Sequence, residues 1–188
     1  RLELHQGDAT SIDFESFVSD VGGALRVVGN LPYNVGSRIV VHIANSAQWV
    51  DRAVVMLQKE VVQRVVAQPG GRSYGLLSVL VTRTFDAHML RVVSSGAFYP
   101  APKVDSALML LQRKAQRLDR QHDEDLIRCA RAAFAQRRKT LRNCLKNKLK
   151  LSNDVLDKVF TLSDIDPACR AETLNLDDYN RLGAALRS

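Results

Sequence analysis

The first 112 residues alternate between short apolar runs and longer stretches in which apolar residues recur at helical spacing. Short runs of this kind predict strands, and the periodic stretches predict helices. The expected strands are residues 1–6, 25–29, 53–57, 88–94 and 106–112. The expected helices are a short one within 11–21 and longer ones at 37–47, 60–67 and 74–84. Because strand and helix alternate from residue 25 onward, the sequence predicts an α/β fold with a parallel pair of strands.

Two of these strands carry further expectations. The run 25–29 is short, apolar and β-branched, which is typical of a strand buried on both faces. It ends at Asn30, and Pro32 cannot continue a sheet ladder, so the chain is expected to leave the sheet there as a loop. The strands 88–94 and 106–112 are connected by too few residues for a crossover helix, which predicts an antiparallel pair at one edge of the sheet.

Beyond residue 112 the pattern becomes entirely helical. A polar, charged stretch at 113–122 is expected to be a linker. The expected helices that follow are residues 123–135, 137–150, 153–160 and 175–186. Leucines at every fourth position of the second of these helices predict its buried stripe. The sequence therefore predicts two domains, residues 1–112 and residues 113–188, the second a small helical bundle.

Composition excludes several classes of protein. The 188 residues are 46% hydrophobic, which is sufficient for a packed core, and no apolar run approaches the length of a membrane span. The N-terminus lacks the layout of a secretion signal, so a cytoplasmic protein without a membrane partner is expected. The three cysteines and four histidines are scattered, and we therefore expect no metal site and no disulfide framework.

The net charge of +7 is concentrated in the second predicted domain. Residues 1–112 carry 10 basic and 9 acidic side chains, whereas residues 113–188 carry 17 and 11. Between residues 128 and 150 there are nine basic side chains and no acidic one. A charged run is usually a solvated face, but such a face ordinarily mixes signs. This distribution favours a polyanionic partner, with nucleic acid preferred over a membrane.

The tetrapeptide Asn30-Leu31-Pro32-Tyr33 is the strongest candidate for chemistry. It follows a predicted strand, at the sheet edge where α/β proteins bind ligands. An asparagine oxygen and a neighbouring main-chain carbonyl could hold both hydrogens of an adenine amine, and an adjacent tyrosine offers the base a stacking surface. The ordinary alternative is a proline turn with Tyr33 as a core aromatic.

Three motifs together resemble a known family. They are Asn30-Leu-Pro-Tyr33, Phe98-Tyr-Pro-Ala-Pro-Lys-Val-Asp-Ser106 and Gln136-Arg-Arg-Lys-Thr-Leu-Arg-Asn143. In this order and spacing they resemble the bacterial small-subunit ribosomal RNA adenine dimethyltransferases (the KsgA family), and the similarity runs from Gly7 almost to the C-terminus. The resemblance implies a Rossmann-like class I methyltransferase domain and a helical RNA-binding domain. It implies transfer of methyl groups from S-adenosylmethionine (SAM) to two adjacent adenosines near the 3′ end of 16S rRNA, in ribosome biogenesis.

The resemblance and the chemistry together assign roles to individual residues. The expected catalytic set is Asn30, Leu31, Pro32, Tyr33 and Phe98, with Phe98 opposing Tyr33 across the base. The alternative for Phe98 is that it fills the core beneath a hairpin. The expected cofactor contacts are Asp8, Ala9 and Asn30, although Asp8 alone would be read as a turn former. The expected RNA contacts are Lys103, Arg137, Arg138, Lys139, Arg142 and Lys146. The partner implied is the 30S ribosomal subunit, and we expect a monomer.

One departure from the family's pattern changes the expectation. No Gly-x-Gly turn stands before Asp8, and the family's acidic residue after its second strand is also missing, so the sequence looks N-terminally incomplete. We therefore expect these 188 residues by themselves to bind SAM poorly and to be inactive. Two alternatives remain open: a catalytically inactive rRNA-binding or ribosome assembly factor, and a DNA N6-adenine methyltransferase.

Overall fold

The chain folds into two units. A computed structural model describes residues 2–21, 23–115 and 119–187. The first unit is Arg1–Gln63 with Thr84–Ala115, and the second is Arg64–Arg83 with Gln116–Ser188. The segment Arg64–Arg83 thus packs with the C-terminal helices although it precedes the last two strands. A domain boundary at residue 112 remains a proposal.

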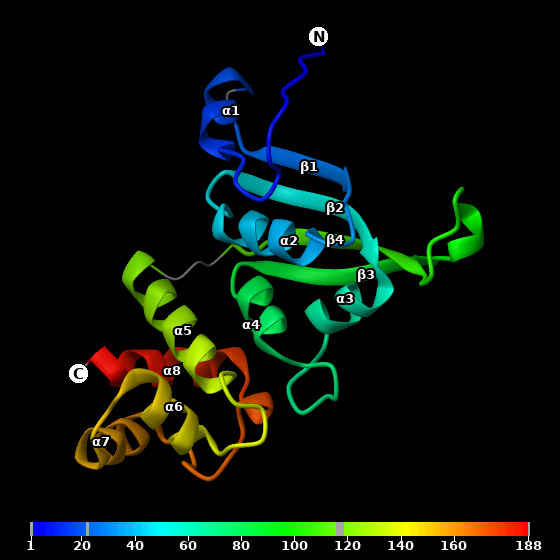
Figure 1. The fold of residues 1–188 in the computed structure, drawn as a ribbon. Helices are drawn as coiled ribbons and strands as arrows, with labels where there is room; N and C mark the ends of the chain where they lie inside the picture. Colours follow the sequence, from blue (N-terminus) through cyan, green and yellow to red (C-terminus); the bar gives the residue numbers. More distant parts are fainter. Residues whose placement is uncertain (1, 22, 116–118, 188) are drawn as a thin grey trace. The chain divides into compact units, whose positions relative to one another are not determined.

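The first unit is built on a four-stranded mixed sheet (Figure 1). Its strands, in spatial order, are β1 (Leu25–Asn30), β2 (Val50–Gln58), β4 (Ser106–Arg113) and β3 (Phe85–Val93). β1 and β2 are parallel, and β4 is antiparallel to both of its neighbours, β2 and β3. The expected parallel pair and the expected antiparallel pair, with β3 at the edge, are both confirmed.

Three helices belong to this α/β part of the chain. They are α1 (Phe14–Val21), α2 (Gly36–Asn45) and α3 (Lys59–Val65). α2 connects β1 to β2 and packs on β2, lying across one face of the sheet (Figure 1). Its buried side includes Ile39, Val40 and Ile43, which recur at helical spacing as the sequence predicts. This packing fixes the direction in which the chain leaves β1.

Two expectations for the first unit are wrong. Residues 2–6 are not a strand, and Leu2 and Leu4 are 84% and 87% exposed. A strand requires a hydrogen-bonding neighbour, and within the described residues no strand pairs with this segment. β1 is not buried on both faces either: its residues alternate between half-buried and exposed, and Val28 is 84% exposed. β1 is the edge strand of the described sheet, and its exposed residues all lie on one face, because side chains alternate between faces along a strand.

The second unit is a helical bundle. Its helices are α4 (Leu76–Thr82), α5 (Arg120–Ala133), α6 (Leu141–Leu149), α7 (Asn153–Ser163) and α8 (Leu176–Arg187). One apolar cluster joins them, with Tyr179 fully buried and its hydroxyl donating to the Ala171 carbonyl at 2.8 Å. α5 and α8 approach so closely that a Cβ on Gly183 would lie 3.2 Å from the Asp125 backbone. A larger residue at this position would separate the two helices.

The expected helix 137–150 begins later than predicted, at the first of its three leucines. α6 starts at Leu141, and Thr140 is its N-cap, with the side-chain oxygen accepting a hydrogen bond from the Asn143 amide. Residues 137–139 lie in a turn before the helix. The first amides of α6, at Leu141 and Arg142, donate to the carbonyls of Cys169 and Pro167 at 2.8 and 3.2 Å. This capping fixes the start of the helix.

Candidate functional site

The candidate site begins where β1 ends. Asn30 is the last residue of β1 and lies opposite Met56 of β2. The Leu31 amide makes one more ladder bond, to the Met56 carbonyl at 2.9 Å. Pro32 has no amide hydrogen to continue the ladder, and its carbonyl accepts from the Val35 amide at 3.2 Å. The tetrapeptide is therefore a tight connection between the strand and α2, as the sequence predicts.

Two hydrogen-bond acceptors in this connection are free. Within the described residues, neither the Asn30 side chain nor the Leu31 carbonyl has a hydrogen-bond partner. Asn30 is exposed, whereas the Leu31 side chain is buried and anchors the loop. An exposed carboxamide beside an unpaired carbonyl can bind a group that donates two hydrogens, such as a primary amine.

Tyr33 is held by its hydroxyl. The Tyr33 hydroxyl lies 2.6 Å from the Ser106 hydroxyl, which is fully buried at the start of β4. Ser106 in turn lies opposite Gln58 in the β2–β4 ladder. Because the hydroxyl is bound at this point, the half-buried Tyr33 ring has a fixed direction. Ser106 ends the Phe98 motif in the sequence, but nothing in the sequence identifies it as the hydrogen-bond partner of Tyr33.

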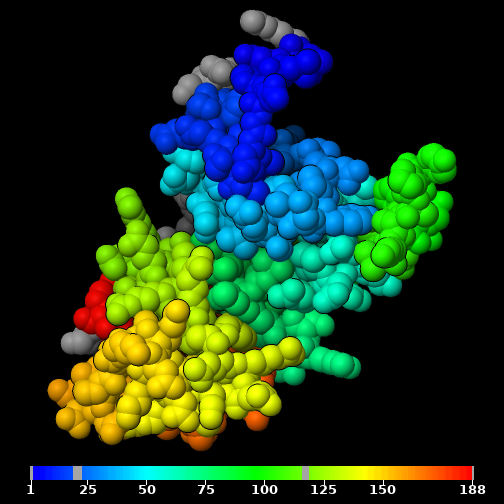
Figure 2. Space-filling model, in the orientation of Figure 1, coloured from blue at the N-terminus to red at the C-terminus, as the bar shows by residue number. Residues whose placement is uncertain are grey.

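The loop between β3 and β4 is closed by its own hydrogen bonds. The Ser94 side chain accepts from the Gly96 amide, and the Asp105 carboxylate accepts from the Ser95 amide at 3.2 Å. The short 3₁₀ helix η1 (Ser95–Ala97) leads into Phe98, whose amide donates to the Ser95 carbonyl. The loop forms a projection at the edge of the first unit (Figure 2). These bonds, together with two prolines, make the loop stiff.

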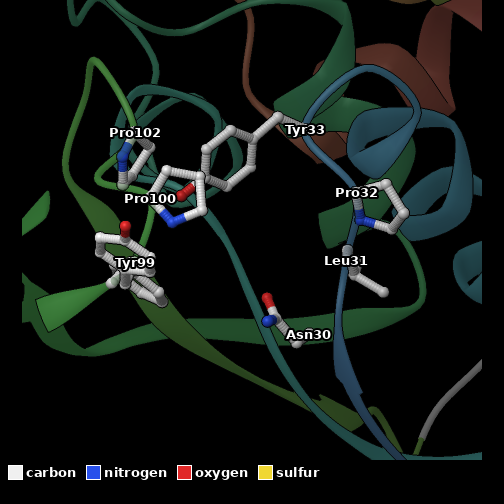
Figure 3. Close-up of a pocket in the computed structure, with 8 residues that line it drawn as sticks. Asn30, Leu31, Pro32, Tyr33, Tyr99, Pro100 and Pro102 are labelled. Carbon is white, nitrogen blue, oxygen red and sulfur yellow. The ribbon is translucent and has the colours of Figure 1, made fainter.

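The tetrapeptide and the loop line one pocket of about 390 Å³. Its residues are Asn30, Leu31, Pro32, Tyr33, Phe98, Tyr99, Pro100 and Pro102. In Figure 3 the Tyr33 ring points toward Pro100, and the Asn30 carboxamide points into the space between the two segments. The structure thus brings together all five residues of the expected catalytic set. Tyr99, Pro100 and Pro102, which belong to the same loop as Phe98, also line the pocket.

The expected cofactor residues Asp8 and Ala9 are exposed and do not line this pocket. The Asp8 carboxylate accepts a hydrogen bond from the Thr10 amide at 2.8 Å. This bond holds the pKa of Asp8 below its usual value, and the charge of Arg38 lowers it further. The same loop is attached to α2, because the His42 ring lies 2.7 Å from the Ile12 carbonyl. Asp8 is thus an exposed turn former whose carboxylate is held by Thr10.

The expected RNA-binding residues fall into three groups. Lys103 is exposed and lines a second, polar pocket beside the first. Arg137, Arg138 and Lys139 are exposed and form no ion pair with any described residue. Arg142 and Lys146 are engaged within the bundle, the first with Asp157 at 2.6 Å and the second with the Asn153 side chain at 2.8 Å. The segment that carries the last two groups lies at the surface of the helical unit (Figure 2).

The described residues contain neither a candidate metal site nor a membrane-spanning helix. In residues 2–21, 23–115 and 119–187, no cluster of histidine, cysteine, aspartate or glutamate side chains could hold a metal ion. Within the same ranges no helix has the length and hydropathy of a membrane span. The cysteines are free thiols, and burial raises the pKa of Cys129 to about 12.

Comparison with known sequences gives one consistent result. Residues 1–187 match the family model described as ribosomal RNA adenine dimethylase. A protein of Pseudomonas aeruginosa named ribosomal RNA small subunit methyltransferase A is 43% identical over 187 residues, which cover 99% of this chain and 67% of the relative. A protein of the same name from Dechloromonas aromatica is 40% identical over 183 residues, covering 97% and 68%. The chain thus spans about two thirds of the length of these relatives.

Comparison with solved structures agrees on the fold. A dimethyladenosine transferase from Plasmodium falciparum superposes with a TM-score of 0.75 at 24% identity, over 96% of this chain and 70% of that one. The 23S rRNA methyltransferase ErmE superposes with a TM-score of 0.65 at 22% identity, over 88% and 66%. At these identities the likeness supports the fold, a Rossmann-like methyltransferase sheet with a helical C-terminal region, as the sequence predicts.

Proposed function

Because the chain belongs to the ribosomal RNA adenine dimethylase family, we propose that it carries the adenine site of an enzyme that dimethylates two adjacent adenosines near the 3′ end of 16S rRNA. The observation that carries the proposal is the pocket at the end of β1, where two acceptors without a partner among the described residues accompany three aromatic side chains, those of Tyr33, Phe98 and Tyr99. A flat, amine-bearing base matches both features. This modification would serve ribosome biogenesis, with the 30S subunit as the partner.

The pocket would act by holding the amine in one orientation. The Asn30 side-chain oxygen and the Leu31 carbonyl accept its two hydrogens, which directs the nitrogen lone pair away from the ring plane. Tyr33 and Phe98 stack on the two faces of the base after it has left its helix. Pro32 ends the sheet ladder and thereby keeps the Leu31 carbonyl out of the strand pairing.

No general base is needed in this reaction. The residues lining the pocket include no carboxylate, histidine or lysine. The methylated amine is acidic and releases its proton to water, so catalysis depends on positioning rather than on a titrating side chain. SAM, when bound, supplies an electrophilic methyl group. We assign Asp8, Ala9 and Asn30 to holding it, because Asp8 is an exposed carboxylate and Asn30 is an exposed carboxamide at the end of β1.

The helical unit would supply RNA affinity. Arg137, Arg138 and Lys139 are exposed, and their side chains have no partner in the part of the chain that the structure describes, so they are available for phosphate groups. Contacts of this kind are salt-dependent and weakly selective for sequence, as expected for a grip on folded RNA. We propose the same role for Lys103, Arg142 and Lys146. To bind RNA, Arg142 has to release Asp157, and Lys146 has to release Asn153.

Replacing Asn30 by alanine tests the proposal. Because we expect these 188 residues alone to be inactive, methyl incorporation into unmethylated small subunits is measured at saturating SAM on a fusion that supplies a glycine-rich cofactor turn ahead of residue 1. Subunit binding is measured separately by filter retention. We expect Asn30→Ala to abolish turnover and to leave subunit binding unchanged, because Asn30 is exposed and contributes nothing to the core. Turnover by the variant at the unaltered rate would exclude Asn30 from the reaction, and an RNA assembly function would then be preferred.

The expectation that these 188 residues bind SAM weakly is tested separately. No Gly-x-Gly turn precedes Asp8 in the sequence, and such turns hold the methionine end of the cofactor in the family that the motifs resemble. Calorimetric titration of the chain with SAM measures the affinity directly. A dissociation constant in the ordinary micromolar range would contradict the expectation and would show that the present residues suffice.

A further inference from the structure

A second pocket, of about 490 Å³, lies beside the first and has no role in the mechanism above. We call it the lateral pocket. Its residues are Gln58, Lys59, Glu60, Gln63, Ser95, Lys103, Val104 and Asp105. All but Val104 carry polar side chains. They come from the end of β2, the start of α3 and the loop before β4, which are all parts of the first unit or its immediate continuation.

The two pockets are connected through the chain and through the sheet. Pro102 lines the adenine pocket, and the next residue, Lys103, lines the lateral pocket. On the sheet side, Ser106 binds the Tyr33 hydroxyl and lies opposite Gln58 in the ladder. The segment Pro102–Ser106 therefore contributes residues to the walls of both pockets, and a ligand that occupies both has to pass it.

Part of the lateral pocket is a fixed frame. The Lys59 amide donates to the Asp105 carbonyl at 3.0 Å, and the Lys59 ammonium lies 3.8 Å from the Asp105 carboxylate. The other carboxylate oxygen of Asp105 accepts from the Ser95 amide at 3.2 Å. Asp105 thus joins both walls of the pocket and has its charge offset by Lys59. It serves to shape the pocket rather than to bind a ligand.

The remaining polar side chains have no partner. Within the described ranges, the side chains of Gln58, Glu60, Gln63 and Lys103 form no hydrogen bond or ion pair. They offer two carboxamides, one carboxylate and one ammonium group. The two carboxamides can both donate and accept, the carboxylate accepts from an amine, and the ammonium matches a phosphate. A ligand that satisfies them needs an edge with an amino group and an attached anion.

We propose that the lateral pocket binds the nucleotide adjacent to the target adenosine in the RNA strand, reading a base that carries an exocyclic amine. This inference rests on the proposed function, since it needs the target base in the first pocket. Glu60 and Gln63 accept from and donate to the base edge, and Lys103 contacts the linking phosphate. With two adjacent adenosines as substrate, the neighbouring base is itself an adenine. Its amine can donate to the Glu60 carboxylate, and its ring nitrogen can accept from the Gln63 carboxamide.

The charge balance of the pocket favours a nucleotide over a simple anion. Lys59 and Lys103 are balanced by Glu60 and Asp105, so the pocket has no net positive charge with which to attract a free phosphate. Its polar lining equally disfavours an apolar ligand. A neighbouring uracil presents a carbonyl where adenine has its amine, and this carbonyl would face the Glu60 carboxylate without a hydrogen between them.

The inference is tested by measuring the affinity of the chain for labelled single-stranded oligoribonucleotides by fluorescence anisotropy and forming two affinity ratios. The first ratio compares an oligonucleotide with a target adenosine to one with an abasic site at that position, and reports the pocket at the end of β1. The second compares adenosine with uridine at each neighbouring position and reports the lateral pocket. We expect the chain to prefer a neighbouring adenosine by about tenfold at one of the two sides, from a good pair of base-edge hydrogen bonds.

Substitutions assign each ratio to its pocket. Gln63→Ala and Glu60→Ala should reduce the second ratio to about one and leave the first unchanged, since both residues are exposed on α3 and contribute nothing to the core. Gln48→Ala and Glu15→Ala remove the same side chains at exposed positions outside both pockets and should change neither ratio.

The outcomes separate the two proposals. The lateral pocket is overturned if the unaltered chain binds neighbouring adenosine and neighbouring uridine equally well. It is also overturned if the preference for adenosine persists in both Gln63→Ala and Glu60→Ala. In either case the adenine site stands, provided that the unaltered chain prefers a target adenosine to an abasic site and Asn30→Ala weakens this preference. A first ratio of one in the unaltered chain overturns the adenine site and the lateral pocket together.

Discussion

Neutralising the three cations of the turn before α6 should remove a defined part of the salt dependence of RNA binding. Arg137, Arg138 and Lys139 are exposed and without ion pairs among the described residues, whereas Arg142 is already paired with Asp157. We therefore expect the triple variant R137Q/R138Q/K139Q to lose phosphate contacts. The variant R142Q should lose a surface ion pair instead, which is worth about 0.2–1 kcal/mol of folding stability.

The size of the effect follows from the number of contacts. Each phosphate contact contributes about 0.7–0.9 to the slope of log affinity against log salt concentration, so loss of three lowers the slope by about 2–3. Between about 50 and about 200 mM salt, the unaltered chain should lose about 20- to 40-fold more affinity than the triple variant. The variant should accordingly be weakest, relative to the unaltered chain, at low salt.

Small-subunit binding measured by filter retention over this salt range gives the slope. The matched control is R64Q/R72Q/K158Q, which removes three exposed cations of the same helical unit and lowers the net charge of +7 equally. If control and variant change the slope by the same amount, the effect is one of net charge and the turn has no specific contact. An unchanged slope in the variant refutes the assignment outright.

Three further predictions concern the pocket and the bundle. In the fusion that supplies a glycine-rich cofactor turn, Phe98→Ala should reduce RNA methylation while leaving SAM affinity unchanged, because a base–aromatic stack is worth about 1–3 kcal/mol; equal losses in both assays would remove Phe98 from the base site. Tyr33→Phe leaves the buried Ser106 hydroxyl without its 2.6 Å partner and should cost about 1–3 kcal/mol in urea unfolding, with part of the loss restored by adding Ser106→Ala. Burial raises the pKa values of Cys129 and Tyr74 to about 12, from 9.0 and 10.0. The unfolded chain therefore loses these protons first, and unfolding free energy should fall from pH 9 to 12, less steeply in Cys129→Ala; an unchanged slope in that variant would contradict the role of Cys129.

The parts of the fold that the sequence predicts are those fixed by local patterns. α2 is one example, because Ile39, Val40 and Ile43 recur at helical spacing and are all buried on one side. The turn at Pro32 is another, since a missing amide hydrogen ends a ladder in any context. The sequence predicts β1 correctly as a strand but predicts its burial wrongly. Burial depends on which elements cover a strand and not on the strand's own residues.

The pocket at the end of β1 depends on long-range contacts. Tyr33 and Phe98 belong to motifs 65 positions apart, and they line one pocket only because β4 pairs with β2 in the register that places Ser106 opposite Gln58. The resemblance of the motifs to a family is the basis for predicting that Tyr33 and Phe98 lie opposite each other across a base. The hydrogen bond that orients Tyr33, and the lateral pocket formed on the other side of the same segment, have no signal in residue types or spacing.

The turn at residues 137–139 shows how a helix prediction can extend too far. The basic run before Leu141 contains no residue that breaks a helix, but the start is set by Thr140 and by carbonyls contributed by residues 167 and 169, which no local pattern reveals. The difference matters for function. On a helix, three consecutive cations diverge by about 100° each and could not all face one surface. In a turn they are free of this constraint, so three neighbouring phosphates on one RNA surface can be contacted together, which is the condition that the salt-slope prediction requires.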